Sequence, residues 1–442
     1  MKNYKKAFLL LLVLVCGQIF SQENKRTKEE RLEWFKDAKL GIFIHWGIYA
    51  VNGIDESWSF FNNYISYPDY MKQLNGFTAK EYDPEYWSKL IKESGAKYTI
   101  ITTKHHDGVA LWNTKYGHLN VVDKTKAKRD LIAPFVNAVR KENLKIGLYY
   151  SLLDWSHPDY PNFLRHEKRY TKDAKRWKSF TKFNFGQIEE LTAFNPDLYW
   201  FDGDWEQSAE MWKAKEIREL LLERTPTTII NSRLQGYGDY ATPEQGVPIT
   251  KPDNNYWELC MTMNNSWGYQ PNDMEYKTTN QLIRILVDCI SMGGNLLLDI
   301  GPKPDGTIPQ EQIAILKGIG RWTSKHKEAI YGTRAGIPYG HFNGYTALSK
   351  DKTMLYLYVD NKPNGPLLIK GLKNKINRIW VVGNGTKLSH KVVGKQYWSA
   401  VPGLLYIDVP EKVQDKDVTV IAVLLDGEVD LYREKGQVIE SN

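Results

Sequence analysis

The most constraining feature of the sequence is a repeated alternation of short apolar runs with helical stretches, which ends near residue 330. The apolar runs are continuous in Ile, Leu, Val and Tyr, which is typical of strands covered on both faces. Stretches with helical apolar spacing, such as 176–194, lie between them. The pattern predicts a parallel α/β fold, and its length favours a (β/α)8 barrel. The runs are LGIFIHWG (40–47), KYTIITTKHHDG (97–108), LKIGLYYS (144–151), DLYWFDG (197–203), TTIINSR (227–233) and GGNLLLDIGP (293–302).

Only six strands are clear, and residues 51–96 are rich in loops, so a doubly wound open sheet stays open as an alternative. Against it, no glycine-rich nucleotide turn follows the first run. From about residue 340 the pattern changes to short strands separated by turn residues, which predicts an antiparallel β-sandwich. We therefore expect a (β/α)8-like TIM barrel over residues 22–340, which would be the catalytic domain, and a C-terminal β-sandwich over residues 341–442.

The first 21 residues have the pattern of a signal peptide. A basic start is followed by an apolar stretch that is too short to span a bilayer, and Ser21 is a small residue at a suitable cleavage position. Export to the periplasm or the medium is the expectation. Val15 precedes Cys16 where a lipoprotein would have a small residue, which argues against a lipid anchor. Removing this segment takes away three lysines and lowers the net charge from +7 to +4, so nothing points to a nucleic-acid or membrane partner.

Chemically useful side chains stand at the ends of five predicted strands. In a (β/α)8 barrel the active site is built where the strands end, so these side chains should meet at one mouth. A single histidine at a strand end is more often structural, but five converging strand ends indicate a site. The residues are His45, His105, His106, Tyr149, Asp202 and Arg233.

The stretch YWFDGDW contains two similar acids, Asp202 and Asp204. Side chains alternate between the two faces of a strand, so Asp202 shares a face with Trp200, while Tyr199 and Phe201 share the other. Gly203 breaks the strand, which places Asp204 beyond it as a turn or cap residue. We therefore expect Asp202 to point into the barrel mouth.

A glycosidic bond is hydrolysed by two carboxyl groups, so Asp202 needs a partner. Glu244 and Glu258 are the candidates that follow Arg233. Glu244 is expected in a loop flanked by proline, which suits a mobile acid/base, and Glu258 is expected to end a sixth strand. Spacing alone does not separate them, because either could instead be a surface acid or a structural partner of Arg233.

Several motifs together resemble the α-L-fucosidases of glycoside hydrolase family 29. The resemblance covers residues from about 30 to 330 and implies the barrel and sandwich described above. It also implies a retaining exo-α-L-fucosidase that removes terminal fucose from glycans through a covalent fucosyl-enzyme. The motifs are FIHWGIYAV, TTKHHDGVALW, GLYYSLLDW, PDLYWFDGDW, INSR, TPEQ and SMGGNLLLDIGPKPDG.

The resemblance also implies roles for individual residues. The family nucleophile falls on Asp202, and the acid/base falls on Glu244, with Glu258 in reserve because the acid/base position varies within the family. A family Glu-Trp pair is interrupted here, because Ser57 separates Glu56 from Trp58. The residues expected to bind the sugar are His45, Glu56, Trp58, His105, His106, Tyr149, Trp200 and Arg233.

Two other functions compete with this one. A metal hydrolase could use the histidines and Asp202, but adjacent histidines in a strand point to opposite faces, and the first strand lacks a His-x-His pair. A non-catalytic carbohydrate-binding protein would keep the sugar site without the two carboxylates. We expect no metal and no cofactor. The expected partner is a fucosylated oligosaccharide or glycoconjugate, and the sequence leaves the oligomeric state open.

Overall fold

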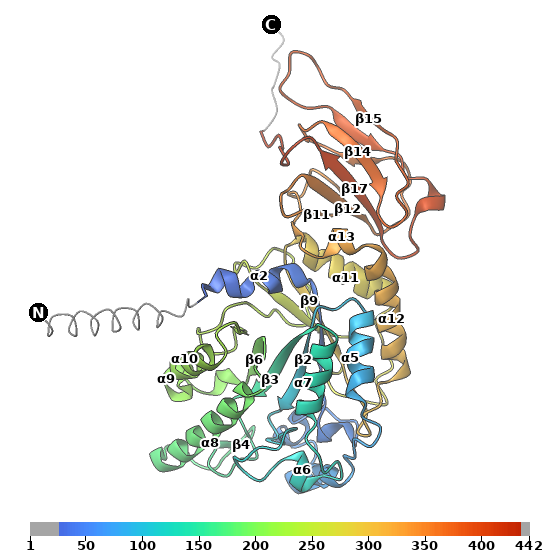
Figure 1. Cartoon of the computed structure of the whole chain (residues 1–442). Helices are drawn as coiled ribbons and strands as arrows, with labels where there is room; N and C mark the ends of the chain where they lie inside the picture. The colour runs from blue at the N-terminus through green and yellow to red at the C-terminus, as the bar shows by residue number, and fades with distance from the viewer. Residues whose placement is uncertain (1–25, 435–442) are drawn as a thin grey trace, which may run out of the picture.

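The computed structural model describes residues 26–434, so the expected signal peptide at residues 1–21 lies outside the described residues. Figure 1 shows a barrel-like domain followed by a domain of antiparallel sheets. The first domain is built on seven parallel strands in the order β7-β6-β3-β2-β1-β9-β8. The strands are β1 (Leu40–Ile44), β2 (Tyr98–Lys104), β3 (Lys145–Ser151), β6 (Leu198–Asp202), β7 (Ile229–Ile230), β8 (Glu258–Thr262) and β9 (Asn295–Ile300).

Helices pack on the outer face of the strands, as the apolar stripes predict. The strands are buried along nearly their whole length, because helices cover one face and the barrel interior the other. The longer helices are α2 (Lys28–Ala38), α5 (Pro84–Glu93), α7 (Ile132–Lys141), α8 (Ala174–Thr192), α10 (Ala214–Arg224), α11 (Thr279–Ser291) and α12 (Gln310–Lys325). Shorter elements are α3 (Trp58–Phe61), α4 (Tyr67–Met71), α6 (Val121–Lys124), α9 (Ala209–Trp212), α13 (Lys327–Ile330) and the hairpin β4 (Asn162–Leu164) with β5 (Glu167–Lys168).

An irregular segment, residues 239–245, fills the gap between β7 and β8. Its backbone pairs with both neighbours: the Asp239 amide donates to the Ile230 carbonyl, and the Cys260 amide donates to the Pro243 carbonyl. Parallel bridges also join Ala241 to Trp257 and Glu244 to Cys260. The segment therefore takes the place of an eighth strand and completes the barrel wall.

Buried ion pairs anchor the start of this closing segment. Asp239 is fully buried and accepts two hydrogen bonds from Arg31 of α2, at 2.9 and 3.0 Å, and one from Arg218 of α10 at 2.8 Å. The Ile230 amide donates to the same carboxylate at 3.0 Å. A buried charge needs such partners, and here they tie two outer helices and β7 to the closing segment.

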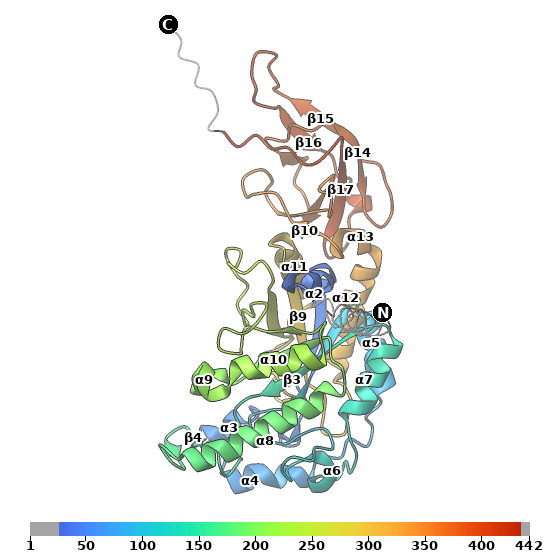
Figure 2. The same cartoon turned by 60° about the vertical axis from the view of Figure 1, so that its left-hand side comes forward.

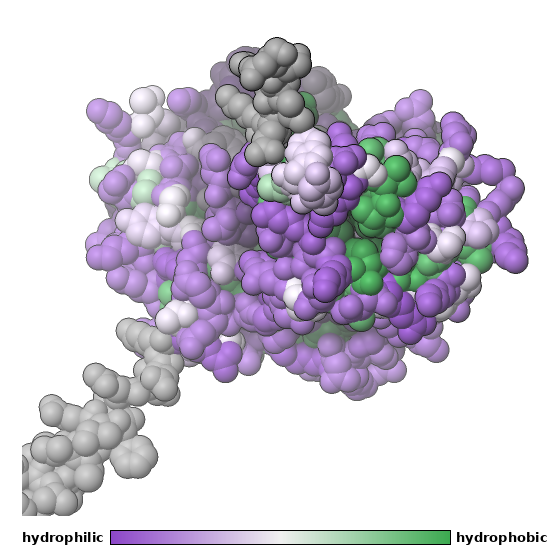
Figure 3. All heavy atoms as spheres, turned by 90° about the horizontal axis from the view of Figure 1, so that it is seen from above, coloured by the Kyte–Doolittle hydropathy of each residue, from purple (hydrophilic) through white to green (hydrophobic). Residues whose placement is uncertain are grey.

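The C-terminal domain is a sandwich of two antiparallel sheets around its own apolar core. Figure 3 views the molecule from this end, where hydrophilic residues cover most of the face and hydrophobic areas are small. The larger sheet contains β10 (Arg334–Ala335), β11 (Tyr345–Leu348), β12 (Met354–Val359), β17 (Thr419–Leu425) and β14 (Ile376–Val381). The smaller contains β13 (Leu367–Ile369), β16 (Leu404–Ile407) and β15 (His390–Val393). Within residues 26–434 we find no helix with the length and apolar character needed to cross a membrane.

Candidate active site

A cavity of about 270 Å³ opens at the C-terminal ends of the barrel strands. Its wall contains three carboxyl groups, two histidines, an arginine and several aromatic rings, which is a lining suited to a small polar ring with an apolar face. Larger hollows lie elsewhere on the surface. The lining residues are Phe43, His45, Glu56, Trp58, His105, Trp200, Asp202, Trp205, Arg233, Glu244 and Trp267.

Asp202 is the last residue of β6 and faces this cavity together with Trp200. On the opposite face, Tyr199 and Phe201 stack with an interplanar angle of 9° and belong to the apolar core. Gly203 ends the strand with φ 79°, and a Cβ there would come within 2.4 Å of Leu153. Both the backbone conformation and the close packing therefore require glycine directly after Asp202.

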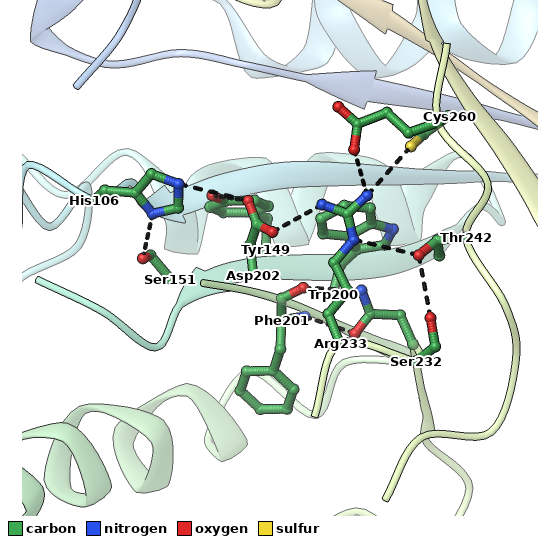
Figure 4. A network of polar contacts seen from close by, with 12 residues as sticks. His106, Tyr149, Ser151, Trp200, Phe201, Asp202, Ser232, Arg233, Thr242 and Cys260 are labelled. Atoms are coloured by element: carbon green, nitrogen blue, oxygen red, sulfur yellow. Dashed lines mark hydrogen bonds and ion pairs between the residues drawn. The ribbon is translucent and has the colours of Figure 1, made fainter. Parts of the chain in front are cut away.

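Arg233 joins two of the three carboxyl groups of the cavity (Figure 4). Its guanidinium donates to Asp202 at 2.8 Å and to Glu244 at 2.5 Å, and lies 4.4 Å from the centre of the Trp200 ring. The second oxygen of Asp202 accepts from the Tyr149 hydroxyl at 3.0 Å. The side chain of Asp202 is 12% exposed and that of Glu244 is 40% exposed. The two acids thus differ in access to water although one guanidinium binds both.

Glu244 lies in the irregular closing segment of the barrel wall, which has no regular strand, as the expectation of a loop requires. Within that loop, Glu244 forms an isolated bridge to Cys260 of β8, and the following Gln245 amide donates to the Cys260 carbonyl. Pairing with β8 determines the position of the Glu244 carboxylate at the mouth.

Glu258 lies in a different place from the one that the sequence indicated. It begins β8 and does not end a strand, so it lies deep in the barrel and is fully buried. Its carboxyl group accepts from the hydroxyls of Tyr98 and Tyr240 at 2.6 and 3.0 Å, and from Nε1 of Trp200 at 3.0 Å. Burial raises the pKa of Glu258 to about 7. A carboxyl group behind the cavity wall cannot reach a leaving group, so this position contradicts the reserve role of Glu258 as acid/base. Its contacts show instead that Glu258 holds the Trp200 side chain.

The two adjacent histidines face the same region, contrary to the expectation of opposite faces. Strand β2 ends at Lys104, so strand alternation no longer applies to His105 and His106, and their ring centres lie 4.2 Å apart. His105 lines the cavity, whereas Nε2 of His106 lies 3.7 Å from Asp202. Burial lowers the pKa of both imidazoles, and of His45, well below the usual value, so all three are neutral.

The hydrogen bonds of His106 determine which nitrogen carries its proton. Its Nδ1 lies 2.6 Å from the Ser151 hydroxyl, which itself donates to the Leu153 carbonyl. Ser151 must therefore accept from Nδ1–H, and Nε2 presents a lone pair toward Asp202. Two acceptors 3.7 Å apart leave a place for a hydroxyl donor beside them.

Glu56, Ser57 and Trp58 all take part in the site despite the interrupted motif. Glu56 has the left-handed φ of 28°, which is strained for a residue with a side chain, and it accepts from the Gly268 amide at 2.5 Å. Burial raises the pKa of Glu56 to about 8, so it is protonated at neutral pH. The Ser57 hydroxyl lies 2.6 Å from Nδ1 of His105, which explains the residue between the expected pair.

Several residues of the site were missed by the sequence reasoning. Phe43, Trp205 and Trp267 line the cavity, and Asp299 at the end of β9 lies 2.7 Å from Nδ1 of His45. The strand end of β9 was a usable signal for Asp299, since only Ile300 separates it from Gly301, where the run NLLLDIG stops. Asp204 lies outside the cavity lining and accepts from the Gln235 amide at 2.9 Å, which is the turn role expected of it.

A parallel barrel with two carboxylates above an aromatic cavity defines the protein as a barrel glycoside hydrolase. A sequence model described as α-L-fucosidase matches residues 17–328. The human tissue α-L-fucosidase is 30% identical over 413 residues, which cover 86% of this chain and 85% of that protein. The chain therefore belongs to the α-L-fucosidase family.

Solved structures agree with this assignment. Isoenzyme 1 of α-L-fucosidase from Paenibacillus thiaminolyticus superposes with a TM-score of 0.83 at 34% identity, covering 90% of this chain and 99% of that chain. An α-L-fucosidase from Bacteroides thetaiotaomicron, trapped as a covalent intermediate with 2-fluoro-fucosyl fluoride, superposes with a TM-score of 0.79 at 28% identity, covering 92% and 98%. The predicted family and the predicted barrel-plus-sandwich fold are confirmed.

The position of Glu258 predicts a large effect on stability. Replacing Glu258 with Leu leaves two hydroxyls and one indole N–H buried without an acceptor, so the free energy of unfolding should fall by about 3–5 kcal/mol. Glu258→Gln keeps one acceptor oxygen and should cost about 1–2 kcal/mol. Urea denaturation followed by tryptophan fluorescence measures both. A Glu258→Leu protein as stable as the unmodified protein would contradict the buried network.

Proposed function

We propose that the protein hydrolyses terminal α-L-fucosyl residues of glycans with retention of configuration. The observation that carries the proposal is the pair Asp202 and Glu244, which one Arg233 guanidinium binds above the cavity. A guanidinium that binds both acids is compatible with the separation of about 5–5.5 Å found in retaining glycosidases. The trapped covalent intermediate of the Bacteroides thetaiotaomicron fucosidase supports the same mechanism by similarity.

The exposures of the two acids suit different roles. Asp202 is the more buried, and it accepts hydrogen bonds from Arg233 and Tyr149 that hold its carboxylate in place beneath the cavity mouth. It attacks the anomeric carbon as the leaving oxygen departs, which forms a covalent ester. Glu244 is more exposed and lies on the solvent side, where it gives its proton to the leaving oxygen. Water, which loses a proton to Glu244, then attacks the anomeric carbon and releases Asp202 as a carboxylate.

The remaining residues of the cavity orient the sugar. A sugar hydroxyl beside His106 Nε2 and Asp202, which lie 3.7 Å apart, would donate its one proton to one of these two acceptors. Protonated Glu56 can donate a further hydrogen bond, while Trp200 and Trp267 offer apolar surface to the ring and to the methyl group of fucose. His45, held by Asp299, and His105, held by Ser57, contribute neutral imidazoles.

Export is a separate part of the proposal. The basic residues, the short apolar stretch and Ser21 in residues 1–21 support a cleaved signal peptide, which would place the enzyme in the periplasm or the medium. Fucosylated oligosaccharides or glycoconjugates in that compartment are the proposed substrates.

Removal of the nucleophile tests the proposal directly. Asp202→Gly should lower kcat for 4-nitrophenyl α-L-fucoside by at least about a thousand-fold, because no covalent intermediate can form. The matched control Asp204→Asn changes the neighbouring acid, which lies outside the cavity, and should keep most of the activity. Substantial turnover by a correctly folded Asp202→Gly protein would disprove the nucleophile assignment.

Azide rescue assigns the second carboxylate by the stereochemistry of the product. In Glu244→Ala, azide should attack the fucosyl-enzyme and give α-L-fucosyl azide, because two inversions retain the configuration. In Asp202→Gly, azide should displace the leaving group once and give the β-anomer. Nuclear magnetic resonance of the products distinguishes the anomers. If Glu244→Ala gave no azide product, or gave the β-anomer, Glu244 would not be the acid/base.

The raised pKa of Glu56 predicts a pH effect on substrate binding. Its folded pKa of about 8 lies above the usual value, so the donor is present below pH 8 and is lost as pH rises through 8. KM for 4-nitrophenyl α-L-fucoside should therefore rise up to about tenfold between pH 7 and 9. Glu56→Gln keeps a donor that does not ionise, so its KM should stay nearly constant. An equal alkaline rise in Glu56→Gln would assign the effect to another group.

A further inference from the structure

We propose that a basic groove beside the cavity binds an anionic leaving group, so that the preferred substrates are fucosylated glycans with carboxylate or sulfate groups near the fucose. The inference rests on the proposed function, because the groove is a leaving-group site only if the cavity holds the fucosyl ring. It adds a substrate class that the cavity itself does not determine.

Consecutive residues of the chain line the cavity and the groove. Trp205 lines the cavity and is 49% exposed, which places it at the mouth. The next two residues, Glu206 and Gln207, line a groove of about 730 Å³. A leaving group that projects from the cavity on the side of Trp205 would approach this groove.

Two structural elements form the other walls of the groove. One is the hairpin β4–β5, which is bound to α3 because the Arg165 amide donates to the Phe61 carbonyl at 2.9 Å. The other is the start of α8, and Figure 2 shows both elements on the same side of the barrel as α3. Trp177 and Tyr170 supply partly exposed aromatic rings to the groove, which suits the C–H faces of sugar rings.

The groove is rich in lysines that have no acidic partner within the part of the chain that the structure describes. Lys168, Lys172, Lys178 and Lys213 line it, all are exposed, and none forms an ion pair with any residue in the described range 26–434. The stretch 165–182 contains eight lysine and arginine residues against two acids. Of these eight basic residues, Arg176 alone has a carboxylate partner among residues 26–434. Such a surface attracts anions at a distance and binds them on contact.

The acids of the groove are largely engaged in the protein itself. Asp173 caps α8 by accepting from two backbone amides. Glu206 accepts from the indole of Trp155, the Tyr160 hydroxyl and the Asn162 amide at 3.1, 2.6 and 2.7 Å. Glu210 is the remaining acid of the lining and is exposed. The free charge of the groove is therefore positive, and a neutral glycan would leave it unmatched.

The shape favours a glycan over a membrane or a nucleic acid. The lysines line a hollow that also contains aromatic rings and adjoins a sugar-sized cavity along the chain, and aromatic rings in a hollow suit sugar rings. An anionic oligosaccharide can place its fucose in the cavity and its charged sugar against the lysines at the same time.

Matched ligands test the proposal in the full chain with Asp202→Asn, which prevents turnover during the measurement. Isothermal titration calorimetry gives Kd for three probes: 2′-fucosyllactose, the same trisaccharide with a sulfate on galactose, and its analogue with galacturonic acid in place of galactose. At about 20 mM salt the anionic probes should bind about tenfold more tightly than the neutral one. At about 500 mM salt the difference should shrink to about twofold because exposed charges are screened.

Two sets of substitutions locate the effect. Changing the groove lysines together, as Lys168→Gln, Lys172→Gln, Lys178→Gln and Lys213→Gln, should bring the three Kd values close to equality. The control set Lys317→Gln, Lys387→Gln, Lys391→Gln and Lys395→Gln removes the same charge from exposed positions outside the groove lining and should leave the preference unchanged.

The outcomes separate this inference from the proposed function. Equal affinity for neutral and anionic probes, or a preference that survives loss of the groove lysines, overturns the inference. A preference for one anionic probe alone supports it and identifies the anion as sulfate or carboxylate. Failure of the unmodified enzyme to hydrolyse 4-nitrophenyl α-L-fucoside would instead overturn the proposed function, while the binding ratio would still test the groove.

Discussion

The site depends most on the buried ion pairs that Asp239 forms with Arg31 and Arg218. Seven strands leave a gap in the barrel wall, and the segment that fills it begins at this residue. Arg31 and Arg218 reach the carboxylate from two outer helices. Removing one partner of a buried ion pair costs about 3–5 kcal/mol, so the start of the segment is strongly held. Five residues later the same segment presents Glu244 at the mouth.

The site itself is organised by a second charged group, Arg233. One guanidinium binds Asp202 and Glu244 and lies over Trp200, so Arg233 contacts both acids and an aromatic ring of the site. Trp200 is in turn held from behind by Glu258. The polar network thus continues from the cavity into the barrel interior, and a residue that cannot touch the substrate still determines how the cavity wall is oriented.

Much of this could be predicted from local pattern. Continuous apolar runs identified the parallel strands, and alternation along β6 separated Asp202 from Asp204. The failures share a cause, because each concerned a residue near a strand boundary. Alternation was applied to His105 and His106, but β2 had already ended at Lys104. Glu258 was placed at the end of a strand that it begins.

The sequence by itself determined the fold class, the family and the residue types that gather at the barrel mouth. These properties follow from apolar periodicity and short motifs, which can be recognised within a few neighbouring residues. Only the tertiary structure decided which glutamate faces the cavity and which one supports Trp200. It also brought four lysines from separate parts of the chain around one groove: Lys168, Lys172, Lys178 and Lys213. The physical reason is that hydrogen bonds and ion pairs between distant segments, such as Arg31 with Asp239, leave no periodic trace in the sequence.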